Sequence, residues 1–344
     1  MTTYAEVIPT DGALTTASES RPYGLATLKE LEEQIKAAPS TFVVRDLIPE
    51  ATVNIAVGDS GLGKTAWAYQ LGLAVATGVP FIGHETRQGR VVYFDLENGT
   101  GQVVEVARRL CAHLGVDSFP GENFFVLTLG DGARKLADIV KQCQPSLVII
   151  DTLRAGWPEA EKDNECAAKL LNMQRSLARE FGTAFILLHH TKKPTHHAFG
   201  GSPSLEHGPI MGWLLEAAGA RALVNQTDVR IGFDRPKQND DVALIIKGHA
   251  KMRGEFGPIY LERKLDSDGE VTGYCRLSSA GLLTDPHQKE TYMKLPAEFT
   301  FAQAKAIYER SDDPTNKLLQ RCIALGILEK VKKGIYRKTG GAST

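Results

Sequence analysis

The segment that most constrains this chain is GDSGLGKT, which stands between an apolar run and a run of helical character. It consists of Gly58, Asp59, Ser60, Gly61, Leu62, Gly63, Lys64 and Thr65. Glycines let such a loop curl until its backbone N–H groups face one point, and the following helix adds its positive end. The pattern has this meaning where a strand precedes it and a helix follows. TVNIAVG (52–58) and the run 64–77, closed by Gly78, provide both, so the sequence predicts a phosphate-binding loop in an α/β fold.

Strand-like and helix-like runs alternate along the chain on both sides of this loop. The expected strands are 52–58, 90–97, 124–129, 146–151 and 183–190, and the expected helices are 64–77, 103–114, 133–143 and 166–181. Alternation of this kind predicts a mainly parallel sheet with helices on both faces. The later segments 220–235, 241–253 and 257–265 look instead like consecutive strands and hairpins.

Composition narrows the class of protein. The 344 residues suffice for one large domain and a small one, and 40 basic against 41 acidic residues leave no global field, so any nucleic-acid surface must be local. The five cysteines are scattered, without a CxxC pair, and are interpreted as reduced thiols. No apolar stretch approaches the length of a membrane span, so we expect a soluble, cytoplasmic protein without a membrane partner.

The chain divides into four expected parts. Residues 1–40 are a flexible extension that contains a short helix at 28–35. Residues 41–276 form the α/β domain, 277–286 a linker, and 287–344 a small C-terminal domain.

Asp151 ends the apolar run LVIID, which is the usual setting for an acid that holds a metal near a phosphate. We expect Asp151 and Thr65 to hold Mg²⁺ while Lys64 reaches the β- and γ-phosphates of ATP. The alternative for Asp151 is a strand-end carboxylate that caps a loop. Many ATPases place a glutamate directly after such an aspartate to activate water, but here that position is Thr152.

A base is therefore expected elsewhere, and the run VVYFDLENG offers Asp95 and Glu97 at the end of another apolar strand. If that strand lies beside the phosphate-loop strand, its carboxyl end falls in the same crevice. A carboxylate there can deprotonate the water that attacks the γ-phosphate. The alternative is that Glu97 caps the next helix or faces solvent.

The order of GDSGLGKT, YFDLE, LVIID and FILLHH resembles that of the RecA-like ATPases. Within them, residues 40–265 are most similar to the RepA-type plasmid and phage helicases and, more widely, to the DnaB-like replicative helicases. The resemblance implies that Glu97 is the catalytic base and that His190, rather than its neighbour His189, senses the γ-phosphate. It also implies that Lys251 and Arg253 reach into the next subunit of a ring, such as a hexamer. Apart from the resemblance, a KxR pair is most often a solvated turn.

DNA contacts are predicted in two places. The long segment after His190, rich in Gly and Pro, corresponds in RecA-like machines to loops that line the DNA channel. Its cations are Lys192, Lys193, His196, His197 and Arg221. They fit phosphate contacts and a solvated surface equally well.

The C-terminal domain resembles a winged helix. Thr300 and Gln303 form a capping-box pattern, Asp313 and Pro314 suit the start of a second helix, and a hairpin is expected to turn near Gly334. Its cations, with Glu329 as the only expected opposing charge, are Lys317, Arg321, Lys330, Lys332, Lys333, Arg337 and Lys338. These suit a recognition helix and wing on duplex DNA, or a module that docks on a primase or another replication protein.

These patterns together favour a ring-forming, RecA-like ATPase that translocates along or unwinds DNA in plasmid or phage replication. Two alternatives stay open: a recombinase-like or helicase-loading ATPase, and an ATP-gated DNA-binding regulator. Phe299 begins an FxxA pattern that some filament-forming ATPases use, but core packing explains it better. A small-molecule kinase fits least, because it needs neither Arg253 in trans nor a basic C-terminal domain.

Overall fold

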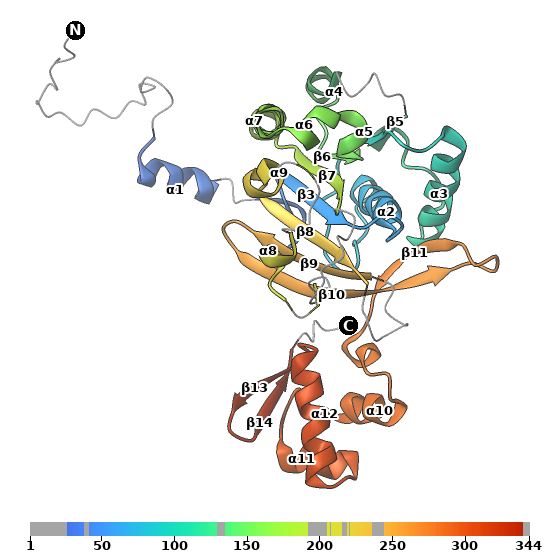
Figure 1. The fold of residues 1–344 in the computed structure, drawn as a ribbon, viewed down its shortest axis with the longest axis vertical. Helices are drawn as coiled ribbons and strands as arrows, with labels where there is room; N and C mark the ends of the chain where they lie inside the picture. The colour runs from blue at the N-terminus through green and yellow to red at the C-terminus, as the bar shows by residue number, and fades with distance from the viewer. Residues whose placement is uncertain are drawn as a thin grey trace, which may run out of the picture. The chain divides into compact units, whose positions relative to one another are not determined.

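The computed structural model describes residues 26–37, 41–128, 135–191, 205–206, 208–214, 219, 221–235 and 244–339. The chain separates into two compact units, Met1–Thr41 and Phe42–Thr344. The first contains helix α1 (Leu28–Ala37), which confirms the helix expected there (Figure 1). Residues 1–25 and 38–40 of the extension predicted to be flexible lie outside the described residues.

The second unit is built on a nine-stranded sheet with the strand order β11-β10-β9-β8-β3-β7-β6-β4-β5 (Figure 1). Its parallel strands are β3 (Val53–Gly58), β4 (Val91–Asp95), β5 (Phe124–Leu127), β6 (Leu147–Asp151), β7 (Ala184–His190) and β8 (Val229–Asp234). Three antiparallel strands continue it: β9 (Leu244–Ala250), β10 (Gly254–Leu265) and β11 (Val271–Arg276). A separate pair, β1 (Phe42–Val44) and β2 (Ile48–Pro49), precedes them. The mainly parallel sheet predicted from the alternation is confirmed.

Helices cover both faces of the sheet, because neighbouring residues of each central strand point to opposite sides. Ile149 belongs to one buried cluster with Leu71 of α2 (Lys64–Thr77), whereas Ile150 belongs to another with Leu171 of α7 (Asn164–Phe181). The other helices of this part are α3 (Thr100–His113), α4 (Leu136–Cys143), α5 (Leu153–Gly156), α6 (Pro158–Lys162), α8 (Ile210–Trp213) and α9 (Arg221–Gln226). None of the helices within the described residues has the length and apolarity to cross a membrane.

Two expectations about local structure are wrong. Segment 220–235 is not all strand, since α9 forms first and buries Ala222 and Leu223. Six residues are too few to reveal helical spacing, and packing against α7 decides the conformation. The strand expected at 90–97 ends at Asp95, because its carboxylate accepts hydrogen bonds from the backbone N–H groups of Glu97 (3.3 Å) and Asn98 (2.9 Å) and turns the chain.

The C-terminal part consists of three helices and a three-stranded antiparallel sheet of order β12-β14-β13. In chain order they are α10 (Pro286–Lys294), β12 (Glu298–Thr300), α11 (Phe301–Tyr308), α12 (Asp312–Ala324), β13 (Leu328–Lys332) and β14 (Ile335–Lys338). The capping box of Thr300 with Gln303 is confirmed. The N-cap of α12 is Ser311 rather than the expected Asp313. Phe299 is buried and stacks on Tyr336, so its role in the core is confirmed.

Candidate nucleotide-binding and catalytic site

The phosphate loop joins β3 to α2 in the conformation that its glycines allow. Gly61 and Gly63 have φ angles of 74° and 91°, which favour glycine, and a side chain at Gly63 would collide with the hydroxyl of Tyr274. Lys64 is 5% exposed, and its ammonium donates to the carbonyls of Gly58 (2.9 Å) and Asp59 (2.6 Å). Burial lowers the pKa of Lys64, while Asp151 opposes the shift. The lysine is thus held over the loop, where phosphates would take the place of the two carbonyls.

Asp151 meets the start of α2 at the carboxyl end of β6. It is 2% exposed and accepts hydrogen bonds from the hydroxyls of Thr65 and, at 2.8 Å, Tyr93. Burial raises the pKa of Asp151 to about 6, although both hydrogen bonds oppose the shift. The Thr65 hydroxyl and the Asp151 carboxylate are hard oxygen donors in direct contact, and this donor set fits Mg²⁺.

Two tyrosines that sequence analysis missed hold the carboxylates of this site. The rings of Tyr69 (α2) and Tyr93 (β4) stack with centroids 4.0 Å apart. The Tyr69 hydroxyl donates to Asp95 (2.8 Å), as that of Tyr93 does to Asp151, and burial raises the pKa of both tyrosines. Their spacing was the available signal, since Tyr69 lies one helical turn beyond Thr65 and Tyr93 two strand positions before Asp95.

Glu97 reaches the site by a different route from the one expected. Strands β7 and β6 lie between β3 and β4, so the condition that β4 neighbours the phosphate-loop strand is not met. Helix α2 instead packs over both β4 and β6. Glu97 is exposed, and its Oε1 accepts a hydrogen bond from the Thr152 hydroxyl at 2.7 Å. Its charge acts on Lys64 and Asp151, which places the three side chains in one site.

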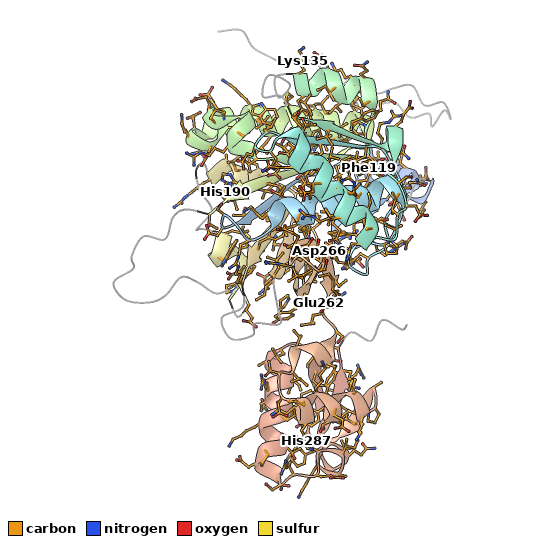
Figure 2. All side chains as sticks on the ribbon, turned by 90° about the vertical axis from the view of Figure 1, so that its right-hand side faces the viewer. Phe119, Lys135, His190, Glu262, Asp266 and His287 are labelled. Carbon is orange, nitrogen blue, oxygen red and sulfur yellow. The ribbon has the colours of Figure 1, made fainter. Side chains whose placement is uncertain are left out.

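His190 ends β7 directly beside the phosphate-loop strand, where it pairs with Gly58 (Figure 2). Burial, and then the charge of Lys64, lowers the pKa of His190, so the ring is neutral near pH 7. Its Nδ1 is buried and has no hydrogen-bond partner among the described residues. A buried ring nitrogen without a partner, next to the phosphate loop, suits contact with a bound phosphate.

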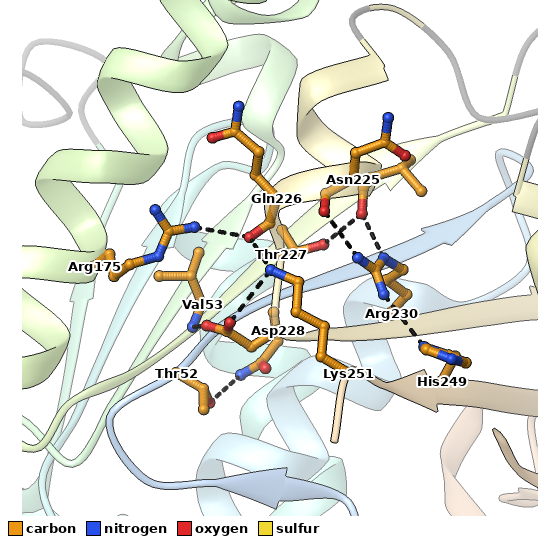
Figure 3. Close-up of polar contacts among 12 residues, drawn as sticks. Thr52, Val53, Arg175, Asn225, Gln226, Thr227, Asp228, Arg230, His249 and Lys251 are labelled. Atoms are coloured by element: carbon orange, nitrogen blue, oxygen red, sulfur yellow. Dashed lines mark hydrogen bonds and ion pairs between the residues drawn. The ribbon is translucent and has the colours of Figure 1, made fainter. Parts of the chain in front are cut away.

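Lys251 (Figure 3) and Arg253 lie in the turn between β9 and β10. The turn follows Ala250, which pairs with Val229 at the start of β8, whereas Gly58 pairs with Phe233 near its end. A strand of this length separates the two edges by roughly 15 Å or more. The turn therefore does not lie at the phosphate loop of its own chain.

The side chain at the start of this turn, that of Lys251, is anchored by hydrogen bonds and an ion pair (Figure 3). The Lys251 ammonium donates to the carbonyl of Gln226 (2.8 Å) and lies 3.6 Å from Asp228, which also accepts a hydrogen bond from the backbone N–H of Val53. Arg253 is exposed, and its guanidinium makes no hydrogen bond or ion pair with any described residue. An anchored turn thus presents an unpaired cation to the solvent.

A basic groove of about 740 Å³ lies where α5, α6, α7 and α9 begin or end. Arg154, Lys162 and Arg221 line it, while Glu161 opposes Arg154 at 3.5 Å. Sequence analysis selected Arg221 alone, because Arg154 and Lys162 come together with it only through the packing of these helices. The expected contacts Lys192, Lys193, His196 and His197 lie outside the described residues.

The cations of the C-terminal part are more often paired than the sequence suggested. Glu329 is not the only opposing charge, because Arg337 pairs with Glu298 as well as with Glu329, and Lys317 pairs with Asp313 at 2.8 Å. Arg321 bonds to Thr284 and Gln288, and Lys338 to the carbonyl of Leu295. Lys330, Lys332 and Lys333 are exposed and have no ion pair with a described residue. The ion pair of Lys317 with Asp313 joins two exposed side chains and is therefore weak, so Lys317 is able to leave it and contact a phosphate.

The fold and the site define a P-loop nucleoside triphosphatase with a RecA-like sheet. A family model described as an AAA domain matches residues 20–196, a little over half of the chain, and the chain belongs to this family of P-loop ATPases. The match ends before β8 and before the turn that carries Lys251 and Arg253. A comparison with curated proteins gives no match.

Proposed function

We propose that this chain is an ATP-dependent DNA translocase or helicase, similar to the RepA type, that hydrolyses ATP between the subunits of a ring. The supporting observation is the position of Arg253. It is unpaired among the described residues and lies at the edge of the sheet opposite the chain's own phosphate loop. A cation placed there serves hydrolysis only by entering the site of a neighbouring copy, which requires head-to-tail interfaces of the kind that close into rings.

Within one chain, the site supplies the phosphate-binding loop and the carboxylates. Lys64 and the loop N–H groups hold the phosphates, and Thr65 with Asp151 would hold Mg²⁺, which neutralises charge on the β- and γ-phosphate oxygens. Glu97 accepts a proton from the water that attacks the γ-phosphorus, the bond to the bridging oxygen breaks, and ADP is released with inorganic phosphate. His190 lies where contact with the γ-phosphate reports its presence or loss.

The neighbouring chain supplies Arg253, with Lys251 beside it, to the charge that spreads over the transferred phosphoryl group. Asp228 and Gln226 hold Lys251 and so fix the base of the turn. Loss or return of this contact at each hydrolysis shifts one subunit against the next. The ring size proposed from the resemblance is six.

Two surfaces suit DNA. The basic groove is lined by three cations, of which Arg154 pairs with Glu161 and Lys162 with the exposed Glu159, and it fits the backbone of a single strand because such surface pairs are weak. The order helix, strand, helix, helix, hairpin from α10 to β14 supports a winged helix, with Lys332 and Lys333 on its hairpin. We propose single-stranded DNA in the groove, and duplex DNA or a primase-like protein at the hairpin. The setting is plasmid or phage replication in the cytoplasm.

Mixed assemblies test the shared site. Chains with Glu97→Gln and chains with Arg253→Ala are each expected to be inactive, while a random mixture restores about one interface in four, because each active interface takes one functional half from each chain. ATPase rate is measured in the mixture and in each variant alone, together with native mass. An inactive mixture, or an active monomer, would contradict the ring.

DNA coupling separates this proposal from the alternatives. A translocase accelerates ATP hydrolysis on single-stranded DNA and displaces a paired strand. Strand exchange or helicase delivery without displacement would identify the recombinase-like or loading ATPase. Slow hydrolysis that ignores single-stranded DNA would identify the regulator.

A further inference from the structure

The residue directly after Asp151 makes a hydrogen bond that sequence patterns did not reveal. Thr152 is 2% exposed, and its hydroxyl donates to Oε1 of Glu97 at 2.7 Å. The hydroxyl oxygen of Thr152 also accepts a hydrogen bond from the backbone N–H of Ala155 at 3.4 Å, so that Thr152 is the N-cap of α5. A hydroxyl has one proton to donate. Because Ala155 uses a lone pair of Thr152, the proton remains for Glu97.

The backbones on either side are fixed to each other up to this point. Asp95 pairs with Asp151 at the ends of β4 and β6, and the N–H of Leu96 donates to the carbonyl of Asp151 at 2.8 Å. Glu97 and Thr152 therefore follow two strand ends that are hydrogen-bonded to each other, and Thr152 is buried. The hydroxyl therefore has a defined position from which to hold a glutamate that is itself exposed.

Glu97 needs such a partner because no other described residue forms a hydrogen bond with its carboxylate. Its backbone N–H donates to Asp95 at 3.3 Å, which anchors the main chain only. Its side chain has three torsions and, within the described residues, one hydrogen bond, the one from Thr152. That bond occupies Oε1 and leaves Oε2 as the acceptor for the proton of the attacking water. A base is effective only if it is held within hydrogen-bond reach of that water.

We propose that Thr152 is a positioning residue for Glu97, so that the position which carries the base in other ATPases here orients a base supplied by another strand. This inference rests on the proposed role of Glu97. A residue that acts in this way affects the rate of the chemical step and leaves nucleotide binding intact. A residue that only caps α5 would affect hydrolysis regardless of whether Glu97 is a carboxylate.

The experiment compares the full-length chain with Thr152→Val, which keeps the shape and removes the donor, and Thr152→Ser, which keeps the hydroxyl. We expect Thr152→Val to lower kcat about 10- to 100-fold, in line with the cost of misplacing a catalytic group. The Kd of a fluorescent ATP analogue should stay within about twofold, since binding does not use this bond. Thr152→Ser should regain most of the lost kcat.

A double-mutant cycle decides between positioning and capping. Thr152→Val is repeated in a chain that already carries Glu97→Gln, and we expect no further fall in kcat there, because the two residues act as a unit. An equal loss in both backgrounds would overturn the inference and assign Thr152 to the cap alone. The inference would also be overturned if Glu97→Gln alone abolished hydrolysis while Thr152→Val alone left kcat unchanged. If Glu97→Gln itself hydrolyses ATP normally, the proposed role of Glu97 fails instead.

Discussion

The two edges of the central sheet differ in how their charged groups are held. At the carboxyl edge, Asp95 and Asp151 are buried, and each accepts a hydrogen bond from a tyrosine of a stacked pair. At the opposite edge, Lys251 is 39% exposed and Arg253 is exposed without an ion pair among the described residues. The first edge is organised before any ligand arrives. The second is fixed only at its base, which is what a group meant for another copy of the chain requires.

The comparison also separates two carboxylates with similar positions at strand ends. Asp151 has no cationic partner that outweighs its burial, and the pKa of its carboxyl is raised to about 6. Asp228 shares its oxygens between the N–H of Val53 and the ammonium of Lys251. Asp151 is suited to bind a metal ion, whereas Asp228 already holds the turn that carries Lys251.

Arg253→Ala is the strongest test of the difference between the two edges. We expect kcat to fall about 10³- to 10⁵-fold, as for other guanidinium groups donated in trans. Thermal stability should change little, because the side chain has no hydrogen bond or ion pair with a described residue to lose. ATPase rate and a thermal melt measure both, and Arg108→Ala, an exposed arginine of α3, is the matched control. Near-normal hydrolysis by Arg253→Ala would mean that the free cation has no catalytic role.

At the organised edge, Glu97→Gln should lower kcat about 10²- to 10⁴-fold, which is the usual contribution of a general base. ATP binding should persist, because the phosphate loop is untouched. Single-turnover hydrolysis separates the two quantities, and Glu122→Gln, an exposed glutamate outside the site, is the control. A Glu97→Gln chain as fast as the control would assign proton abstraction to another group.

Tyr93→Phe tests whether the organisation of that edge matters. Removing the hydroxyl leaves Asp151 with one hydrogen bond fewer, and such loss of support behind a ligand typically weakens metal binding about 10- to 100-fold. The Mg²⁺ concentration for half-maximal ATPase rate should rise accordingly. Tyr308→Phe, in the C-terminal part, should leave it unchanged. Equal Mg²⁺ requirements for both would show that Asp151 holds its position without the tyrosine.

The raised pKa of Asp151 predicts an effect on stability. Because its folded pKa lies above the ordinary value of 3.8, the group contributes stability below that value and loses the contribution as the pH rises through about 6. Asp151→Asn removes the charge and keeps one oxygen that accepts hydrogen bonds from hydroxyls, so it should stabilise the nucleotide-free chain at pH 7 by up to about 3 kcal/mol. At pH 4 the gain should vanish. Urea unfolding measures it, with the exposed Asp268→Asn as the control, and a gain at both pH values would contradict the assignment.

The smallest expected effect is on the salt dependence of DNA binding at the basic groove. Arg154 of this groove lies three residues after Asp151, at the carboxyl edge of the sheet. Each phosphate contact contributes about 0.7 to the slope of log Kd against log salt for single strands. Lys162→Gln should therefore lower the slope for single strands by about that amount, and Lys332→Gln should lower the slope only with duplex DNA, by about 0.9. Binding titrations between low and moderate salt measure both slopes. Unchanged slopes would assign these lysines to the solvated surface.

Strong local patterns predicted their structures well. The strand, loop and helix around Gly58–Thr65 and the turn residue Gly78 follow from short-range backbone preferences, and α2 runs as expected. The segment that became α9 did not follow its pattern, since burial of Ala222 and Leu223 outweighed strand propensity. Arg154 and Lys162 were missed because helix packing alone brings them to Arg221. Tyr69 and Tyr93 had a local signal in their spacing, but the carboxylates that they hold are distant in the chain.

The phosphate loop, the alternation that forms a mainly parallel sheet, and the candidates Asp151 and Glu97 follow from residue type and spacing within about ten positions. His190 was a candidate only through the resemblance to the RecA-like ATPases, which also gave Glu97 its role as the base. Only the tertiary structure decided that β6 and β7 separate β4 from β3, that Thr152 holds Glu97, and that Arg253 lies at the far edge. Strand order and side-chain partners are set by long-range packing, which no local pattern encodes.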